Sequence, residues 1–115
     1  MSVYAMALPI LPEKSEAWQQ YNSQVNGPRR SDFEDMLKRH GFTRWLVWRQ
    51  KTPQSDLLIV FQEGPMSAGE SIGKSDHPFD MWLKDQVKAF TGIDLNQPPP
   101  GPAAELVVRF PSSSK

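Results

Sequence analysis

Apolar residues occupy both faces of the first strand that the sequence predicts. One face carries Tyr4, Met6, Leu8 and Ile10, and the other carries Val3, Ala5 and Ala7. Successive side chains of a strand point to opposite faces of its sheet, and a sheet with one face in water would carry polar residues at every second position. We therefore expect both faces of this strand to be covered.

A β-hairpin is the clearest element in the middle of the chain. Residues 43–51 and 57–63 are rich in Trp, Val, Ile and Phe, and the segment 52–56 between them has the composition of a turn. Both strands again carry large apolar residues on both faces, as Trp45 and Trp48 illustrate. The burial on two faces that is expected of the first strand is expected here as well.

Three segments have the apolar spacing of helices. The expected helices span residues 13–26, residues 28 or 29 to 40, and residues 76–91. Ser31 and Glu34 have the spacing of a capping box, which would move the start of the second helix to residue 31. In the third helix, Asp76 is expected to be the cap and Pro78 to lie in the first turn.

The other segments are rich in residues that interrupt helices and strands. Residues 64–75 hold three Gly, one Pro and three Ser, and they are expected to form a loop or a weak helix. The run Pro98–Pro102 is expected to belong to an extended connector over 96–104, with a polyproline ligand for a partner protein as the alternative. A last strand is expected over 105–110, followed by a disordered tail over 111–115.

The order of these elements predicts the fold class. With the two early helices taken as one broken crossover, the order is β-α-β-β-α-β, which is that of a ferredoxin-like α+β domain spanning residues 1–110. Such a domain has a four-stranded antiparallel sheet with its helices on one face. Because the strands are apolar on both faces, we expect the uncovered face to pack against a second copy in a homodimer.

The segment from Leu8 to Trp18, Leu-Pro-Ile-Leu-Pro-Glu-Lys-Ser-Glu-Ala-Trp, resembles the junction between the first strand and first helix of the dimeric α+β barrel superfamily. Many members of that superfamily read hydrophobic-x-Pro-Gly-Lys-x-x-x-hydrophobic there, whereas this chain has Glu13 where Gly is usual. The resemblance implies a ferredoxin-like fold and a dimer formed sheet to sheet. The superfamily includes cofactor-independent monooxygenases, haem-degrading enzymes, lactone isomerases and stress-response proteins, so the shared fold does not choose a chemistry.

Composition excludes several classes of protein. The chain has 115 residues, 13 basic and 13 acidic side chains, and no cysteine. Without cysteine it has no disulfide, thiolate metal site or Cys nucleophile, and its balanced charge argues against sequence-independent nucleic-acid binding. No segment has the roughly 20 apolar residues of a membrane helix, so we expect a cytoplasmic protein that binds neither nucleic acid nor membrane.

The two histidines are the candidates for acid–base catalysis, because imidazole titrates near neutral pH. His40 lies on the inner stripe of the second helix, where it either faces a pocket or caps and packs that helix. His77 begins the last helix, where it either helps to bind an anion or is a solvated residue beside the expected cap, Asp76. Packing and capping are the commoner roles for such residues. The spacing of the two histidines is not that of a metal site.

Aromatic residues and one arginine are the candidates for ligand binding. They are Tyr4, Trp18, Trp45, Trp48, Arg49 and Trp82. Such side chains suit a flat organic ligand, although packing in the core and at an interface is the commoner use of large aromatics. Residues 29–51 hold seven basic and three acidic side chains. They form either an anion-attracting mouth built from Arg44, Arg49 and Lys51, or a solvated helix face and hairpin rim, or an electrostatic complement between the two halves of a dimer.

Two functions follow as hypotheses. The first is a homodimer that binds a small organic ligand or has a non-catalytic role. The alternative is a cofactor-independent enzyme, monooxygenase-like or isomerase-like, which acts on a small aromatic or anionic substrate in a pocket between helices and sheet. The chain has no Walker, G-x-G-x-x-G or G-x-S-x-G motif, so nucleotide binding by those motifs and serine nucleophile chemistry have no support in the sequence. Since it also lacks cysteine and a metal-site spacing of histidines, we expect no metal and no cofactor.

Overall fold

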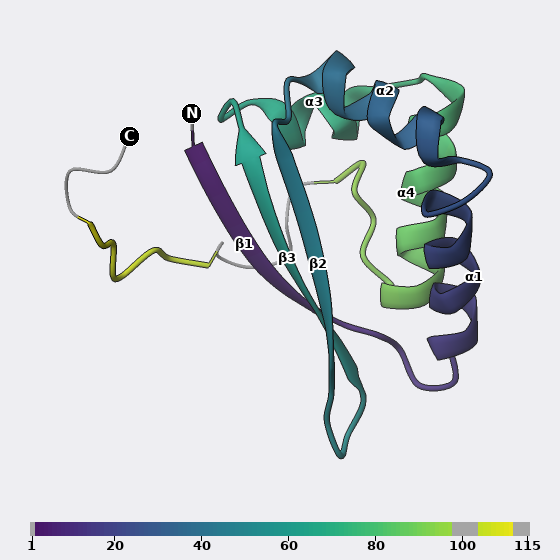
Figure 1. Ribbon diagram of the computed structural model, residues 1–115. Coiled ribbons are helices and arrows are strands. Elements are labelled where there is room, and N and C mark those ends of the chain that lie inside the picture. The colour runs from purple at the N-terminus through teal and green to yellow at the C-terminus, as the bar shows by residue number, and fades with distance from the viewer. Residues whose placement is uncertain (1, 98–103, 112–115) are drawn as a thin grey trace.

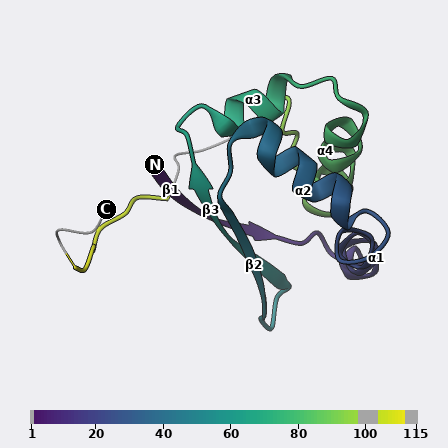
Figure 2. The same ribbon diagram turned by 45° about the horizontal axis from the view of Figure 1, so that its top comes forward.

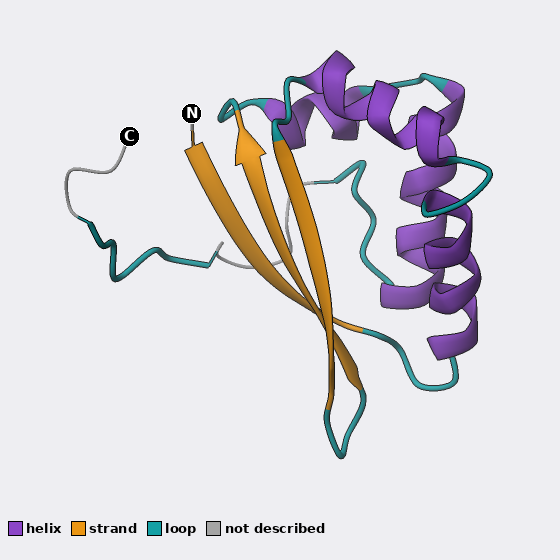
Figure 3. Ribbon diagram, in the orientation of Figure 1, coloured by secondary structure: helices purple, strands orange, loops and turns teal. Residues whose placement is uncertain are grey.

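The computed structural model describes residues 2–97 and 104–111, and it is an α+β structure with its helices on one side of an antiparallel sheet (Figures 1 and 3). The strands are β1 (Ser2–Pro9), β2 (Arg44–Lys51) and β3 (Asp56–Gly64). The helices are α1 (Ser15–Val25), α2 (Arg30–His40), α3 (Ala68–Lys74) and α4 (Pro78–Thr91). The order along the described chain is therefore β-α-α-β-β-α-α.

The three strands lie in the order β1-β3-β2, and both neighbouring pairs are antiparallel. The hairpin of β2 and β3 confirms the prediction made from residues 43–63. In β1 the burial alternates strictly, so that Tyr4, Met6 and Leu8 face the helices while Val3, Ala5 and Ala7 are exposed. The helices thus cover one face of the sheet and leave the opposite face open.

Two clusters of buried side chains join the helices to the covered face of the sheet. The first contains Met36, Phe42, Ala68, Ile72, Phe79 and Leu83. The second contains Ile10, Trp18, Leu58 and Phe90. Helix α4 contributes to both clusters, because Phe79 and Leu83 lie in its first half and Phe90 lies near its end. This helix is therefore the element that connects the two halves of the core.

The helix boundaries differ from the predicted ones at three places. Helix α1 begins at Ser15 rather than at residue 13, because Glu13 has a φ of 65°, in the left-handed region that a right-handed helix excludes. Helix α2 begins at Arg30 without a side-chain cap, so the capping box predicted at Ser31 is not formed. In α4 the cap is His77 instead of Asp76, since the His77 side chain accepts a hydrogen bond from the Phe79 N–H.

The segment 64–75 folds more regularly than its glycines suggest, since it contains helix α3. Ala68 and Ile72, four residues apart, face the first core cluster. Burial of such a stripe, rather than intrinsic propensity, supplies most of the stability of short helices. Tertiary packing therefore outweighs the helix-breaking composition of this segment.

The strand predicted over 105–110 is not formed, so the described sheet has three strands instead of four. The described residues of this segment are exposed and lie beyond β1, away from α1, α2 and α4 (Figures 1 and 2). Strand propensity depends on packing against a neighbouring strand, and among the described residues this segment has no such neighbour. Residues 98–103 of the predicted connector (96–104) and residues 112–115 of the predicted tail (111–115) lie outside the described residues.

No helix in the described part of the chain is both long enough and apolar enough to cross a membrane.

Candidate functional site

A fully buried carboxylate, Asp80 in the first turn of α4, is the centre of the main polar cluster. The Arg39 guanidinium donates two parallel hydrogen bonds to it, from Nη1 to Oδ2 and from Nη2 to Oδ1, each of 2.9 Å. Ser75 Oγ donates to Oδ2 over 2.6 Å, and His40 Nε2 lies 2.7 Å from the same oxygen. One carboxylate thus ties the end of α2 and the segment after α3 to the start of α4.

Asp80 stays charged at neutral pH. Burial by itself raises the pKa of this carboxyl, but the hydrogen bonds from Arg39, Ser75 and His40 and the Arg39 charge outweigh it, and they hold the pKa well below its usual range. The bidentate contact also stabilises the charged form of its partner, since the hydrogen bond to Asp80 raises the pKa of Arg39. The pair is therefore a permanent ion pair at neutral pH.

The charge on Asp80 determines which ring nitrogen of His40 carries a hydrogen. An ionised carboxylate can only accept, so Nε2 of His40 must carry the hydrogen that bridges to Oδ2. When the imidazole is neutral, Nδ1 is then an acceptor, and it lies 2.6 Å from Ser71 Oγ. Ser71 is exposed on α3, whereas only 6% of the His40 side chain is exposed. The chain Ser71–His40–Asp80 therefore links a serine hydroxyl to a base and the base to a carboxylate.

Local structure explains how these three residues meet. His40 is the last residue of α2, and the chain can turn away directly after it because Gly41 has a φ of 83°. Asp80 lies at the N-terminus of α4, where a negative charge is favourable. Ser71 faces solvent because its neighbour Ile72 and Ala68 turn the other side of α3 to the core.

A buried lysine fixes the end of α3 in this arrangement. Lys84 is buried in α4, and its Nζ donates to the carbonyl oxygens of Gly73 at 3.0 Å and Ser75 at 2.8 Å. A cation at these last carbonyls also complements the helix dipole. Among the described residues, every buried side-chain nitrogen and oxygen has a hydrogen-bond partner. The cluster is thus a fully satisfied network that joins α2, α3 and α4.

The open face of the sheet is the second candidate site, and it is apolar. We define it by eight side chains on the three strands: Val3, Ala5, Ala7, Leu46, Trp48, Leu57, Ile59 and Phe61. The register makes these side chains contiguous, because Ala5 pairs with Phe61 and Phe61 with Leu46, while Ala7 pairs with Ile59 and Ile59 with Trp48. Trp48 is 53% exposed. Glu63 and Arg44 pair with one another at one end of this face.

The two histidines predicted as acid–base candidates lie in different places. His40 belongs to the Asp80 network, whereas His77 is exposed and its Nδ1 accepts a hydrogen bond of 3.2 Å from the Phe79 N–H. His77 is therefore engaged in capping α4, and the structure does not bring it together with His40 in one site.

The aromatic residues predicted to bind a ligand do not share a site either. Tyr4 donates a hydrogen bond of 2.6 Å to the Pro65 carbonyl oxygen, and Trp48 lies on the open face. Trp18 is buried, with the Arg49 guanidinium carbon 5.1 Å from its ring centre.

The two other tryptophans pack against further aromatic rings. Trp45 makes edge contacts with Phe33 and Phe42, at ring-centre distances of 5.3 and 5.1 Å. Trp82 stacks on Tyr21 at 5.5 Å, and the Arg29 guanidinium carbon lies 4.3 Å from its ring centre. Packing therefore accounts for the positions of Trp18, Trp45 and Trp82, and among the predicted aromatic residues Trp48 is the one presented on the open face.

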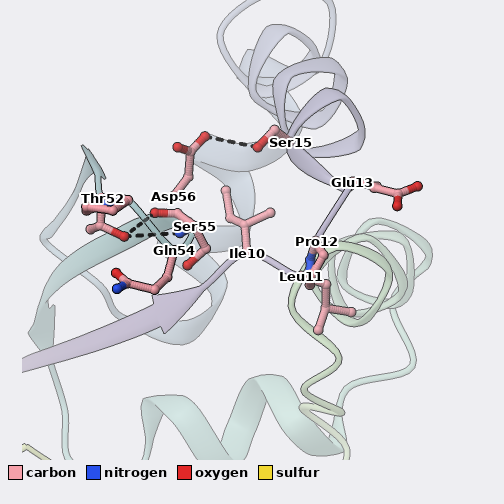
Figure 4. Close-up of a pocket in the computed structure, with 10 residues that line it drawn as sticks. Ile10, Leu11, Pro12, Glu13, Ser15, Thr52, Gln54, Ser55 and Asp56 are labelled. Carbon is pink, nitrogen blue, oxygen red and sulfur yellow. Dashed lines mark hydrogen bonds between the residues drawn. The ribbon is translucent and has the colours of Figure 1, made fainter.

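A small cavity of about 200 Å³ lies between the β1–α1 junction and the turn of the hairpin (Figure 4). Its lining is formed by Ile10, Leu11, Pro12, Glu13, Ser15, Thr52, Pro53, Gln54, Ser55 and Asp56. Ser15 Oγ donates a hydrogen bond of 3.0 Å to Asp56 Oδ2 across it. None of the residues predicted to form a site lines this cavity.

Sequence reasoning missed Ser71, Asp80 and Arg39. Asp80 in a first helical turn looks like an ordinary charge at a helix start, and Ser71 lies in a segment expected to be a loop. The one local signal was His40 on an inner helical stripe, since a buried imidazole requires partners. No family model matches the chain, and no curated protein matches it either. The function therefore has to be argued from the geometry.

Proposed function

We propose that this protein is a homodimer in which the open sheet faces of two ferredoxin-like protomers pack on one another, as in the dimeric α+β barrel superfamily. The observation that supports the proposal is the open face itself, a contiguous apolar surface over all three strands. Contiguous apolar patches on a soluble chain mark sites of interaction. An isologous pairing buries two such faces at once.

A second copy suits this face because its eight apolar side chains carry no charge and its two charged residues have opposite signs. Two such surfaces can meet without burying an unpaired charge, which would cost several kcal/mol. The two charged residues of the same face, Glu63 and Arg44, lie opposite one another at one end of it, and the Arg44 guanidinium carbon lies 5.4 Å from the Phe61 ring centre. The composition of the face is thus that of an interface core with a polar rim.

The conformation of Glu13 supports the resemblance to the superfamily. In the motif of that superfamily, the position of Glu13 is usually Gly. The φ of 65° at Glu13 lies in the left-handed region, which Gly adopts without steric cost. The junction therefore has the backbone shape that the glycine would favour, although the residue differs.

The role that we propose for the dimer is the binding of a small organic ligand, without catalysis. The cavity beside the β1–α1 junction has about 200 Å³, which is below the roughly 300–1,000 Å³ of sites for drug-sized ligands. The ligand would therefore be small. Ser15, Thr52 and Asp56 supply polar atoms beside Ile10 and Leu11, and this mixture suits a compact molecule with both apolar and polar groups.

The substitution Ile59→Lys tests the dimer. Sedimentation velocity of the wild type at micromolar concentration is expected to show a dimer. A lysine in the middle of the open face should weaken dimerisation about a hundredfold or more, because an unpaired buried charge costs about 3–5 kcal/mol. Gln20→Lys on the exposed surface of α1 is the matched control and should leave the dimer intact. A monomeric wild type at 100-fold higher concentration would overturn the proposal.

A second candidate function is cofactor-independent acyl transfer, and the Ser71–His40–Asp80 chain favours it. In the reaction, Ser71 Oγ attacks the carbonyl carbon of a small ester while its proton passes to Nδ1 of His40. The bond from that carbon to the leaving alkoxide breaks, and the alkoxide takes the proton from His40. Water then releases the carboxylic acid from Ser71. Asp80 would hold the imidazole in the tautomer that accepts the serine proton.

Hydrolysis of p-nitrophenyl acetate tests this second candidate. If Ser71 is the nucleophile, Ser71→Ala should lower the rate above the buffer background by about a hundredfold, the usual minimum for a lost catalytic group. The variant should fold, because the side chain is exposed. Ser67→Ala, at another exposed serine next to the same helix, should leave the rate unchanged. Equal rates in Ser71→Ala and wild type would eliminate Ser71 as the nucleophile.

A further inference from the structure

Residues 105–110 have the composition of a strand but no partner strand among the residues that the structure describes. The segment Glu-Leu-Val-Val-Arg-Phe has the β-branched and aromatic composition of a strand. Its apolar side chains are 59% to 86% exposed at Leu106, Val107, Val108 and Phe110. No described backbone hydrogen bond joins it to the sheet. Such an apolar segment in water is a candidate for pairing with a strand edge.

Strand β1 offers an unprotected edge. It pairs with β3 on one side, and its other edge has no neighbouring strand in the described part of the chain. Proteins usually protect such edges with charged residues, bulges or covering elements. β1 carries no charged residue over its eight positions, and its one proline, Pro9, is at its end. The edge is therefore free to accept a further strand.

We propose that, in the homodimer, residues 105–110 of each chain pair with the β1 edge of the other chain. This exchange rests on the proposed dimer and adds a fourth strand to each sheet. The position of the segment supports a partner rather than its own β1. Although covalently joined to the same domain, it extends beyond β1 and away from the helices in both views (Figures 1 and 2).

The side chains of the segment suit a place beside β1. Leu106, Val108 and Phe110 fall on one face of an extended segment, and Glu105 and Arg109 on the other. Both faces of β1 are apolar, so Leu106, Val108 and Phe110 would lie beside apolar side chains of β1 in either register. Glu105 and Arg109 carry opposite charges and flank Val107, so the other row adds no net charge to the sheet.

The absence of cysteine makes the exchange directly testable. Chains with Ala5→Cys in β1 and tagged chains with Val107→Cys are mixed, allowed to exchange, and treated with a short bis-maleimide. Strand exchange is expected to yield a cross-linked species that contains one chain of each kind on a denaturing gel. A mixture of Val107→Cys with Gln20→Cys on α1 is the matched control and should give no such species.

The possible outcomes separate the exchange from the dimer. A cross-link that forms only within the Ala5→Cys, Val107→Cys double variant, as a single chain, would overturn the exchange in favour of pairing within one chain. No cross-link, with a dimer still seen by sedimentation, would overturn the exchange and leave the proposed dimer standing. A monomeric wild type would overturn both.

A proline substitution gives an independent measurement of the same pairing. Val107→Pro removes a backbone donor from the middle of the segment and should weaken the dimer about tenfold or more. Ala104→Pro, just before the segment, should have little effect on dimerisation. Equal dissociation constants for Val107→Pro and wild type would count against the pairing.

Discussion

Replacing Asp80 by Asn is expected to lower the free energy of unfolding by about 3 kcal/mol. Removing one partner of a buried ion pair typically costs about 3–5 kcal/mol, because the other charge is left without compensation. The lower end applies here, since Arg39 keeps its 2.7 Å contact with Asp35. Asp80 also receives hydrogen bonds from Ser75 and His40, so its loss affects α2, α4 and the end of α3 together. Urea unfolding at fixed protein concentration measures the change.

The matched control for this prediction is Asp35→Asn. Asp35 pairs with the same guanidinium but is exposed, and such pairs four residues apart on a helix contribute about 0.3–0.5 kcal/mol. A loss at Asp80 no larger than that at Asp35 would contradict the account of the network.

The pH dependence of stability provides a further check on Asp80. In the folded protein the pKa of this carboxyl lies below its ordinary value of about 3.9, which it regains on unfolding. The wild type is therefore stabilised above about pH 4 and loses this contribution as the pH falls toward the folded-state pKa. Asp80→Asn lacks the carboxyl, so the difference in stability between the two proteins should shrink below pH 4.

Replacing Phe90 by Ala is expected to cost about 3–5 kcal/mol, the usual loss for a large aromatic residue of the core. Phe90 is 2% exposed, packs with Ile10, Trp18 and Leu58, and has its ring centre 5.2 Å from that of Tyr21. The cavity left by the ring would lie where α1, α4 and the β1–α1 junction meet. Urea unfolding measures the loss. Met66→Ala, at a highly exposed apolar residue, should change stability by less than about 0.5 kcal/mol, and comparable losses in the two variants would refute this assignment of the core.

Local sequence patterns were sufficient for the elements that bury a regular stripe. The spacing of Phe79, Leu83 and Phe90 predicted α4 and its inner face, and the β-branched and aromatic composition of residues 57–63 predicted β3. Local patterns failed where long-range contacts decide whether a segment forms a helix or a strand. Helix α3 forms because Ala68 and Ile72 pack into a core cluster. Residues 105–110 have strand composition but no neighbouring strand within the described ranges 2–97 and 104–111.

The candidate site was less predictable than the fold, for a related reason. The partners of His40 lie 31 and 40 residues away, at Ser71 and Asp80, so no spacing motif connects them. That one sheet face would lack a cover of helices could be inferred in advance, since residues 3–10 are apolar on both faces. Tertiary structure alone shows which face that is and which polar groups meet.

The left-handed backbone at Glu13 has a consequence for recognising distant relatives of this chain. The sequence motif usually has Gly at this position, whereas the backbone here needs only a residue that adopts a positive φ. A side chain at such a position costs about 1–2 kcal/mol, which a stable core can absorb. A positive φ can therefore be kept where another residue replaces the usual glycine, so the backbone conformation at such a junction is a criterion of similarity that does not depend on residue type.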